Sequence, residues 1–183
     1  MNTFTTAALR VPVGLIRPLT LGDGRRLLVR PLLPQDGDAE QAFVMRLSAA
    51  SRYRRFHIGL RALPAATLAQ MTQIDHRSHV ALVAQPESED DDEPPIVADA
   101  RCVRAGDHSA EFAIAVADDW QRQGLGRRML QLLACHAARQ GIVQLTGDVL
   151  ADNAPMVSML LSMGCDVKPR WDEPAMLQAT ISL

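Results

Sequence analysis

The chain has 183 residues, 48% of them hydrophobic, and a formal net charge of −2 at pH 7. This length is that of one domain, and the apolar fraction can bury a core without disulfide or metal support. The small net charge excludes a whole-chain attraction to nucleic acid or to an anionic membrane. No run of about 18 apolar residues occurs, so no membrane span is predicted. The three cysteines are odd in number and far apart in the sequence, so no disulfide framework is predicted, and a reducing, cytoplasmic location is favoured.

The first half of the chain predicts an extension followed by strands and short helices. Residues 1–20 lack a charged segment followed by an apolar one, so we interpret them as a loosely ordered extension and not as a secretory signal. Turn residues at 20–25, between two short apolar runs, suggest a hairpin leading into a strand at 26–30, and apolar runs predict strands at 79–84 and 96–103. Helices are expected at 34–47, with Asp36 as its cap, and at 64–72. The loop at 87–93 holds six acids in seven residues, and its role stays open.

The second half begins with an alternating strand at 110–117 that leads into an amphipathic helix. One face of this strand is bulky and apolar, and the other is small except for Glu111. The helical period runs from Gly124 to about Gln140. Further elements are a strand at 143–150, a helix from Asn153 to Gly164, and strands at 166–170 and 175–182. The order predicts a mixed α and β fold, an antiparallel run followed by a strand–helix–strand crossover.

The junction before the amphipathic helix reads Gln121-Arg122-Gln123-Gly124-Leu125-Gly126. Glycines at a helix start let the backbone approach a ligand, and the unpaired first-turn N–H groups and the helix dipole suit a pyrophosphate. Taken alone, the two glycines fit a simple tight turn equally well. A P-loop is excluded because no Gly-Lys-Ser/Thr follows, and a dinucleotide fingerprint because Met129 occupies the position of its third glycine.

This loop has the pattern Gln/Arg-x-x-Gly-x-Gly/Ala and resembles that of the GNAT N-acetyltransferases, in which it binds the pyrophosphate and pantetheine of acetyl-CoA. The resemblance extends from about Arg26 to the end of the chain. The segments Ser51-Arg52-Tyr53-Arg54-Arg55-Phe56, Ile74-Asp75-His76 and Ala110-Glu111-Phe112 look like the catalytic domain of bacterial protein lysine acetyltransferases.

The resemblance implies a GNAT domain over residues 21–183, an α/β (α+β) fold with a mixed, mostly antiparallel sheet of six to seven strands and about four helices. It implies acetyl-CoA as co-substrate, no metal, and transfer to a primary amine, with a protein lysine favoured and a polyamine-like small molecule next. Glu111 takes the role of general base, which would supply about 10²–10⁴-fold in rate. The implied coenzyme contacts are Ile114, Ala115, Val116, Gln121, Arg122, Gln123, Gly124, Leu125, Gly126, Arg127, Arg128, Asn153 and Met156.

One departure from the family concerns the proton that the leaving thiolate needs. Leu160 stands where many relatives have a tyrosine, so no general acid is assigned. A non-catalytic acyl-CoA-binding sensor or partner module is therefore the alternative, against which the retained Glu111 argues. The arginine cluster at 52–61 indicates either a solvated helix face or contacts to substrate or coenzyme. The sequence does not distinguish a monomer from a homodimer.

Overall fold

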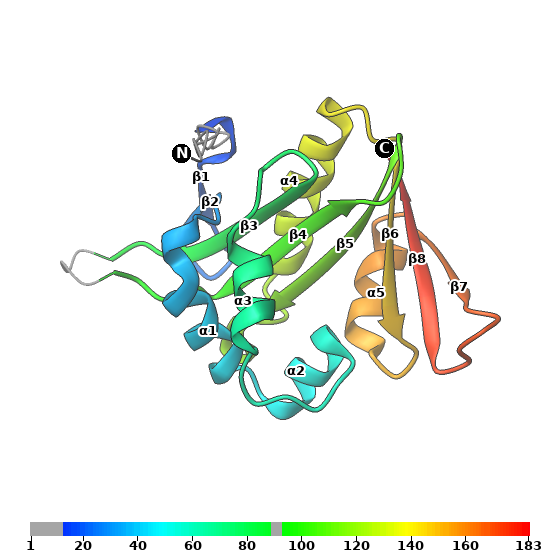
Figure 1. Ribbon diagram of the computed structural model, residues 1–183, viewed down its shortest axis with the longest axis horizontal. Helices are drawn as coiled ribbons and strands as arrows, with labels where there is room; N and C mark the ends of the chain where they lie inside the picture. Colours follow the sequence, from blue (N-terminus) through cyan, green and yellow to red (C-terminus); the bar gives the residue numbers. More distant parts are fainter. Residues whose placement is uncertain (1–12, 89–92) are drawn as a thin grey trace, which may run out of the picture.

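The structure is a computed structural model that describes residues 13–88 and 93–183. Eight strands of the described residues form one sheet in the order β1-β2-β3-β4-β5-β6-β8-β7 (Figure 1). Every neighbouring pair is antiparallel except β5 with β6, which are parallel. The strands are β1 (Arg17–Thr20), β2 (Arg26–Pro31), β3 (His79–Pro86), β4 (Ala98–Arg104), β5 (Ser109–Val116), β6 (Gln144–Leu150), β7 (Asp166–Pro169) and β8 (Met176–Ser182).

Five α-helices of the described residues pack on this sheet. Helices α1, α2 and α3 lie in front of it in Figure 1, and α4 lies behind it. Three short 3₁₀ helices, η1 (Val13–Leu15), η2 (Pro34–Asp36) and η3 (Asp118–Trp120), join elements. None of the described helices combines the length and the apolar content that crossing a bilayer requires. The helices are α1 (Gly37–Arg46), α2 (Ala49–Phe56), α3 (Ala65–Thr72), α4 (Leu125–Arg139) and α5 (Ala154–Ser162).

The predicted fold class is confirmed, but the sheet has one strand more than predicted and the helices number five. The additional strand, β1, pairs with β2 and completes the hairpin that the turn residues at 20–25 suggest, although it lies in the segment assigned to the extension. Its side chains are mostly exposed, so no apolar alternation marks it. The additional helix, α2, is short and arginine-rich and buries none of its residues fully, so few apolar residues mark it in the sequence. Residues 1–12 and the central part of the acidic loop, 89–92, lie outside the described residues.

The apolar stripe of α4 is confirmed as a core face. Met129 and Leu133 are fully buried against the sheet, and His136, on the same stripe, is 7% exposed. Each such apolar side chain contributes roughly 1.5–3 kcal/mol when it leaves water. This packing fixes α4 behind β3, β4 and β5, and so places its N-terminal end beside the end of β5.

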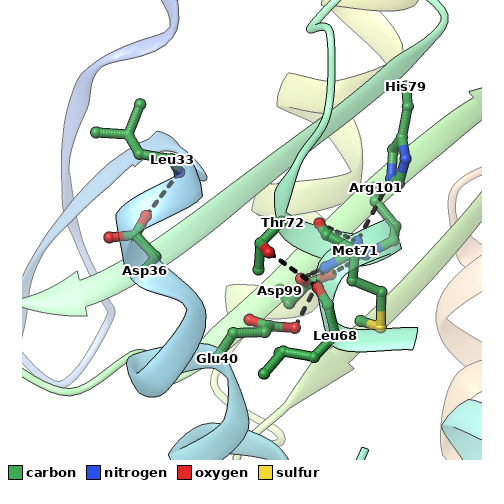
Figure 2. Close-up of polar contacts among 9 residues, drawn as sticks. All are labelled: Leu33, Asp36, Glu40, Leu68, Met71, Thr72, His79, Asp99 and Arg101. Atoms are coloured by element: carbon green, nitrogen blue, oxygen red, sulfur yellow. Dashed lines mark hydrogen bonds and ion pairs between the residues drawn. The ribbon is translucent and has the colours of Figure 1, made fainter. Parts of the chain in front are cut away.

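The predicted cap of α1 has a different role in the structure. Asp36 occupies the N-cap position but makes no side-chain cap hydrogen bond to α1. Its carboxylate instead accepts the backbone N–H of Leu33, at 2.7 Å, and both terminal nitrogens of Arg30, at 2.6 and 3.0 Å. Figure 2 shows the contact with Leu33. Asp36 thus caps the preceding 3₁₀ turn through the Leu33 N–H and ties this turn to β2 through Arg30.

A buried ionic cluster joins β4, α1 and α3 on the front face of the sheet (Figure 2). Arg101 donates Nε to Asp99 Oδ1 at 3.0 Å, Nη2 to Glu40 Oε1 at 3.2 Å and Nη1 to the Met71 carbonyl at 3.0 Å. Burial, followed by the charge of Asp99, raises the pKa of Glu40 well above its ordinary value. Burial opposes ionisation of Asp99 too, but Arg101 outweighs it and lowers the pKa of that carboxyl. Burial thus favours the neutral form of Glu40, and Asp99 is the main counter-ion of Arg101.

His79 lies beside this cluster and makes the fold sensitive to acid. Burial, followed by the Arg101 guanidinium, lowers the pKa of His79 to about 4, whereas an unfolded chain protonates histidine near pH 6.5. The unfolded state takes up the proton first, so the contribution of His79 to stability is complete above about pH 6.5 and is lost as the pH falls toward 4. Allowing for partial exposure, we expect a loss of about 1–2 kcal/mol in the free energy of unfolding.

Urea unfolding of the chain and of a His79→Gln variant, at neutral pH and near pH 4.5, measures this loss. Burial also lowers the pKa values of His76 and His136, and the raised pKa of Glu40 acts in the opposite direction. These groups are present in both proteins, so the difference between the two losses isolates His79. Equal losses in the two proteins would contradict the prediction.

Candidate active site

A cleft of about 980 Å³ opens where β5 and β6 separate. Their parallel pairing comprises three residue pairs and ends at Glu111 with Thr146. Beyond this point β5 keeps its pairing with β4 while β6 keeps its pairing with β8, and Figure 1 shows the two strands diverging. The backbone N–H and C=O groups on the facing edges then have no strand partner across the gap among the described residues. Such groups are strong hydrogen-bonding sites for a ligand that enters the gap.

Glu111 lies at the point where the cleft opens. It is the last residue of β5 that pairs with β6, and its exposed side chain lines the cleft. Its carboxylate makes no hydrogen bond or ion pair within the described part of the chain. Ala113 and Ala115 follow on the same face and leave room beside it. A free carboxylate here can accept a proton from a group bound in the cleft, directly or through one water.

The glycine loop lies at the other end of β5 and has the conformation that an anion site needs. Gly124 has φ +82°, in the left-handed region that favours glycine, and is the N-cap of α4 without a side-chain cap hydrogen bond. The first-turn N–H groups of this 15-residue helix are therefore open at the positive end of its dipole. Gly126 faces Met159 and Val116, where an added Cβ would be 3.6 Å from each. The loop thus offers backbone donors at the cleft wall.

Gln121 connects this loop to β5 and α2. Its side-chain amide donates to the Val116 carbonyl at 3.0 Å and to Ser51 Oγ at 3.1 Å. Asp118 accepts from the backbone N–H and the hydroxyl of Ser48 and from Ser51 Oγ, at 2.7–2.8 Å. Partial burial would raise the pKa of Asp118, but these hydrogen bonds outweigh it and lower the pKa. These contacts hold α2 over the cleft side of β5.

The third side of the cleft comes from α5. Asn153 is its N-cap by position but makes no side-chain capping hydrogen bond, so its amide stays available at the cleft wall. Leu160 is 0% exposed and packs in the core, which leaves the family's tyrosine position without a polar group. Arg127 donates to Ser162 Oγ and so links the first turn of α4 to α5.

The structure brings ten of the thirteen predicted coenzyme residues to the cleft wall. Gln123 instead donates to the Asp119 carbonyl at 3.4 Å, and Leu125 is 1% exposed in the core. Arg128 is exposed outside the lining, with its backbone N–H bonded to the Gly124 carbonyl at 3.1 Å. The ten that line the cleft are Ile114, Ala115, Val116, Gln121, Arg122, Gly124, Gly126, Arg127, Asn153 and Met156.

Two further segments line the cleft that motif reasoning did not assign to it. Helix α2 contributes Arg54 and Arg55, which the arginine cluster at 52–61 left undecided between solvent and ligand. The segment between β7 and β8 contributes Trp171, which is 95% exposed, and Arg170, which bonds Asp148 and Asp172. No sequence motif marks this second segment, because β8 reaches the cleft through its pairing with β6, and β7 through its pairing with β8.

The lining of the cleft carries a net positive charge, whereas the chain as a whole carries a net negative charge. This lining includes six arginine or lysine side chains and three carboxylates, whereas the whole chain has a net charge of −2. Low-dielectric walls strengthen such a field and concentrate anionic ligands. No group of three or more metal-ligating side chains occurs among the described residues. The cleft therefore suits an elongated polyanion that lies along an open strand edge.

Comparisons with known proteins agree with this geometry. Residues 62–165 match the acetyltransferase (GNAT) family. The chain is 33% identical over 146 residues to Acetyltransferase PA5475 of Pseudomonas aeruginosa, covering 79% of this chain and 77% of that one. It is 30% identical over 149 residues to Acetyltransferase Pat of Mycolicibacterium smegmatis, covering 80% of this chain but only 43% of that longer protein.

Among solved structures, the GNAT domain of S. lividans PAT superposes with a TM-score of 0.85 at 25% identity, covering 94% of this chain and 99% of that domain. The chain belongs to the acetyltransferase (GNAT) family and is an acetyltransferase of that family. Its likeness to Pat and PAT agrees with the resemblance seen in the sequence.

Proposed function

We propose that this acetyltransferase moves the acetyl group of acetyl-CoA to a primary amine, with a protein lysine as acceptor and Glu111 as general base. The observation that carries the proposal is the position of Glu111 at the start of the opening between β5 and β6. A thioester bound along β5 would end beside this carboxylate. The three free cysteine thiols favour a cytoplasmic location, since such thiols persist in a reducing compartment.

The coenzyme would lie along β5 from the glycine loop to Glu111. Its pyrophosphate would accept hydrogen bonds from the first-turn N–H groups of α4, with Arg122 and Arg127 adding charge. The pantetheine would hydrogen-bond the open edge of β5 between Ile114 and Val116, as an added strand does. Asn153 and Met156 would contact it from α5. The proposal uses the polar loop, the open strand edge and the cationic lining together.

The reaction follows from the groups at this point. Glu111 accepts a proton from the ammonium form of the acceptor, whose pKa is about 10.4 for lysine. The amine nitrogen then forms a bond to the thioester carbonyl carbon, and backbone N–H groups of β5 stabilise the oxyanion that develops. The carbon–sulfur bond breaks, the thiolate leaves as CoA, and the nitrogen loses its second proton to water. With Leu160 buried, water is the proton donor that the proposal assigns to the thiolate, whose pKa is about 8.5.

Acetyl-CoA should stabilise the folded chain, and ATP and NAD should not. At about 100 times its Kd, a ligand stabilises the folded state by about 2.7 kcal/mol, which corresponds to a rise in Tm of roughly 5–10 °C at this size. A thermal-shift titration measures this without knowledge of the acceptor. No shift with acetyl-CoA, or a larger one with ATP, would refute the coenzyme site.

Thiol release with lysine peptides and with spermidine then tests the transfer and its acceptor. Faster release with peptides supports a protein lysine, and faster release with spermidine supports a polyamine-like substrate. Tight binding of acetyl-CoA with no release from any amine would refute catalysis and support the non-catalytic module.

A further inference from the structure

Arg55 is one of the cleft arginines that have no hydrogen-bond or ion-pair partner among the described residues, unlike Arg127 and Arg170. Arg127 donates to Ser162, and Arg170 is held between Asp148 and Asp172. Arg55, in the last turn of α2, lines the cleft without a hydrogen bond or ion pair to any residue in the ranges 13–88 and 93–183. Its guanidinium lies 4.8 Å from the centre of the neighbouring Phe56 ring. The guanidinium therefore has donor capacity that the described part of the fold does not use.

The buried ionic cluster lies on the same face of the sheet, next to Arg55. Asp99 and Arg101 are the cross-strand neighbours of Ala115 and Ala113, which line the cleft. Burial lowers the pKa of Arg55, and the charges of Asp99 and Glu40 attract the guanidinium while that of Arg101 repels it. Arg55 is thus partly withdrawn from water, and the charges of the cluster act on its guanidinium.

The cluster cannot neutralise Arg55 by itself. The carboxylate of Asp99 is taken by Arg101, which binds it through Nε and Nη2. Burial favours the neutral form of Glu40, which weakens its attraction for Arg55. The two guanidinium groups therefore share mainly the carboxylate of Asp99, and the positive charge of Arg55 is incompletely compensated at the cleft wall. A partly desolvated cation of this kind is costly until an anion pairs with it.

We infer that Arg55 binds an anionic group of a substrate in the cleft, either a phosphate of the coenzyme or a carboxylate of the acceptor. The inference rests on the proposed function, because it takes the cleft to be where coenzyme and acceptor meet. A guanidinium presents a planar fork of N–H donors that matches both phosphate and carboxylate. Arg55 is thus a binding residue that fixes one end of a substrate, and it takes no part in proton transfer.

The test compares Arg55→Gln and Arg55→Lys with Arg61→Gln, an exposed arginine of the same segment that does not line the cleft. Dissociation constants are measured for acetyl-CoA and for S-acetylpantetheine, which lacks the pyrophosphate and the nucleotide phosphate of the coenzyme. KM is measured for two lysine peptides of equal length, one with glutamate beside the lysine and one with glutamine. Thermal unfolding of each variant reports its folding.

If the anion is a coenzyme phosphate, Arg55→Gln weakens acetyl-CoA about tenfold or more and leaves S-acetylpantetheine unchanged. If the anion is an acceptor carboxylate, Arg55→Gln raises the KM of the glutamate peptide about tenfold and leaves the KM of the glutamine peptide unchanged. The dissociation constant of acetyl-CoA is then also unchanged. In either case Arg55→Lys recovers only part of the loss, because it keeps the charge and lacks the fork. Arg61→Gln matches the unmodified chain.

Unchanged constants for all four ligands in Arg55→Gln would overturn the inference, and a lowered Tm with unchanged constants would assign Arg55 a structural role only. Equal losses for S-acetylpantetheine and acetyl-CoA would also overturn it, since they indicate a general distortion of the cleft. If the unmodified chain neither binds acetyl-CoA nor releases thiol, the proposed function itself fails. An active chain with unaffected Arg55 variants removes only the inference about Arg55.

Discussion

Replacing Glu111 by glutamine should slow acetyl transfer by about 10²–10⁴-fold while acetyl-CoA binds as before. The amide has nearly the shape of the carboxylate but cannot accept the proton of the acceptor ammonium. Glu111 lines the cleft at the end of the β5–β6 pairing and makes no ion pair with a described residue. The substitution therefore removes a proton acceptor without breaking a contact of the fold. Steady-state thiol release and a thermal shift with acetyl-CoA measure the two effects separately.

Glu173→Gln is the matched control, because Glu173 is an exposed carboxylate outside the cleft lining. We expect this variant to keep both activity and binding. Full turnover in Glu111→Gln would end the role of this residue as base. Loss of acetyl-CoA binding in the same variant would mean that Glu111 supports the site and not the proton transfer.

Replacing Arg101 by methionine should destabilise the fold by about 3–5 kcal/mol, because the change leaves Asp99 buried without its counter-ion. The side chains of Arg101 and Asp99 are 5% and 2% exposed, and Glu40 lies against them (Figure 2). A protein of this kind has a total stability of about 5–15 kcal/mol, so the loss is a large part of it. Urea unfolding followed by circular dichroism measures the free energy of unfolding.

The control is Lys168→Met, which breaks an ion pair on the surface. Lys168 and Asp166 are 74% and 56% exposed, so water already screens their attraction, and we expect a change of about 0–1 kcal/mol. A triple variant that also carries Asp99→Leu and Glu40→Leu should recover most of the loss, since no buried charge is then left unpaired. A loss near that of Lys168→Met would show that Arg101 is not the counter-ion that holds the cluster together.

Patterns local in sequence predicted the catalytic end of the site. The alternation at 110–117 placed Glu111 opposite the core face, and the change to a helical period after Gly124 placed the glycine loop at a helix start. Both hold in the structure because side-chain direction in a strand and the unpaired N–H groups of a first turn depend on a few consecutive residues. The predicted coenzyme contacts that do not line the cleft are Gln123, Leu125 and Arg128, because Gln123 bonds the Asp119 carbonyl, Leu125 is buried in the core and Arg128 is exposed outside the lining.

Local sequence therefore determined the strand that bears Glu111, the glycine turn with its open N–H groups, and the helix that follows. Only tertiary structure decided which distant segments complete the cleft, because pairing of β6 with β8 and packing of α2 across β5 depend on contacts far apart in the chain. The same holds for the ionisation of Glu40 and for the unpaired charge of Arg55. Both depend on burial and on neighbours from other elements, which no spacing of residues along the chain records.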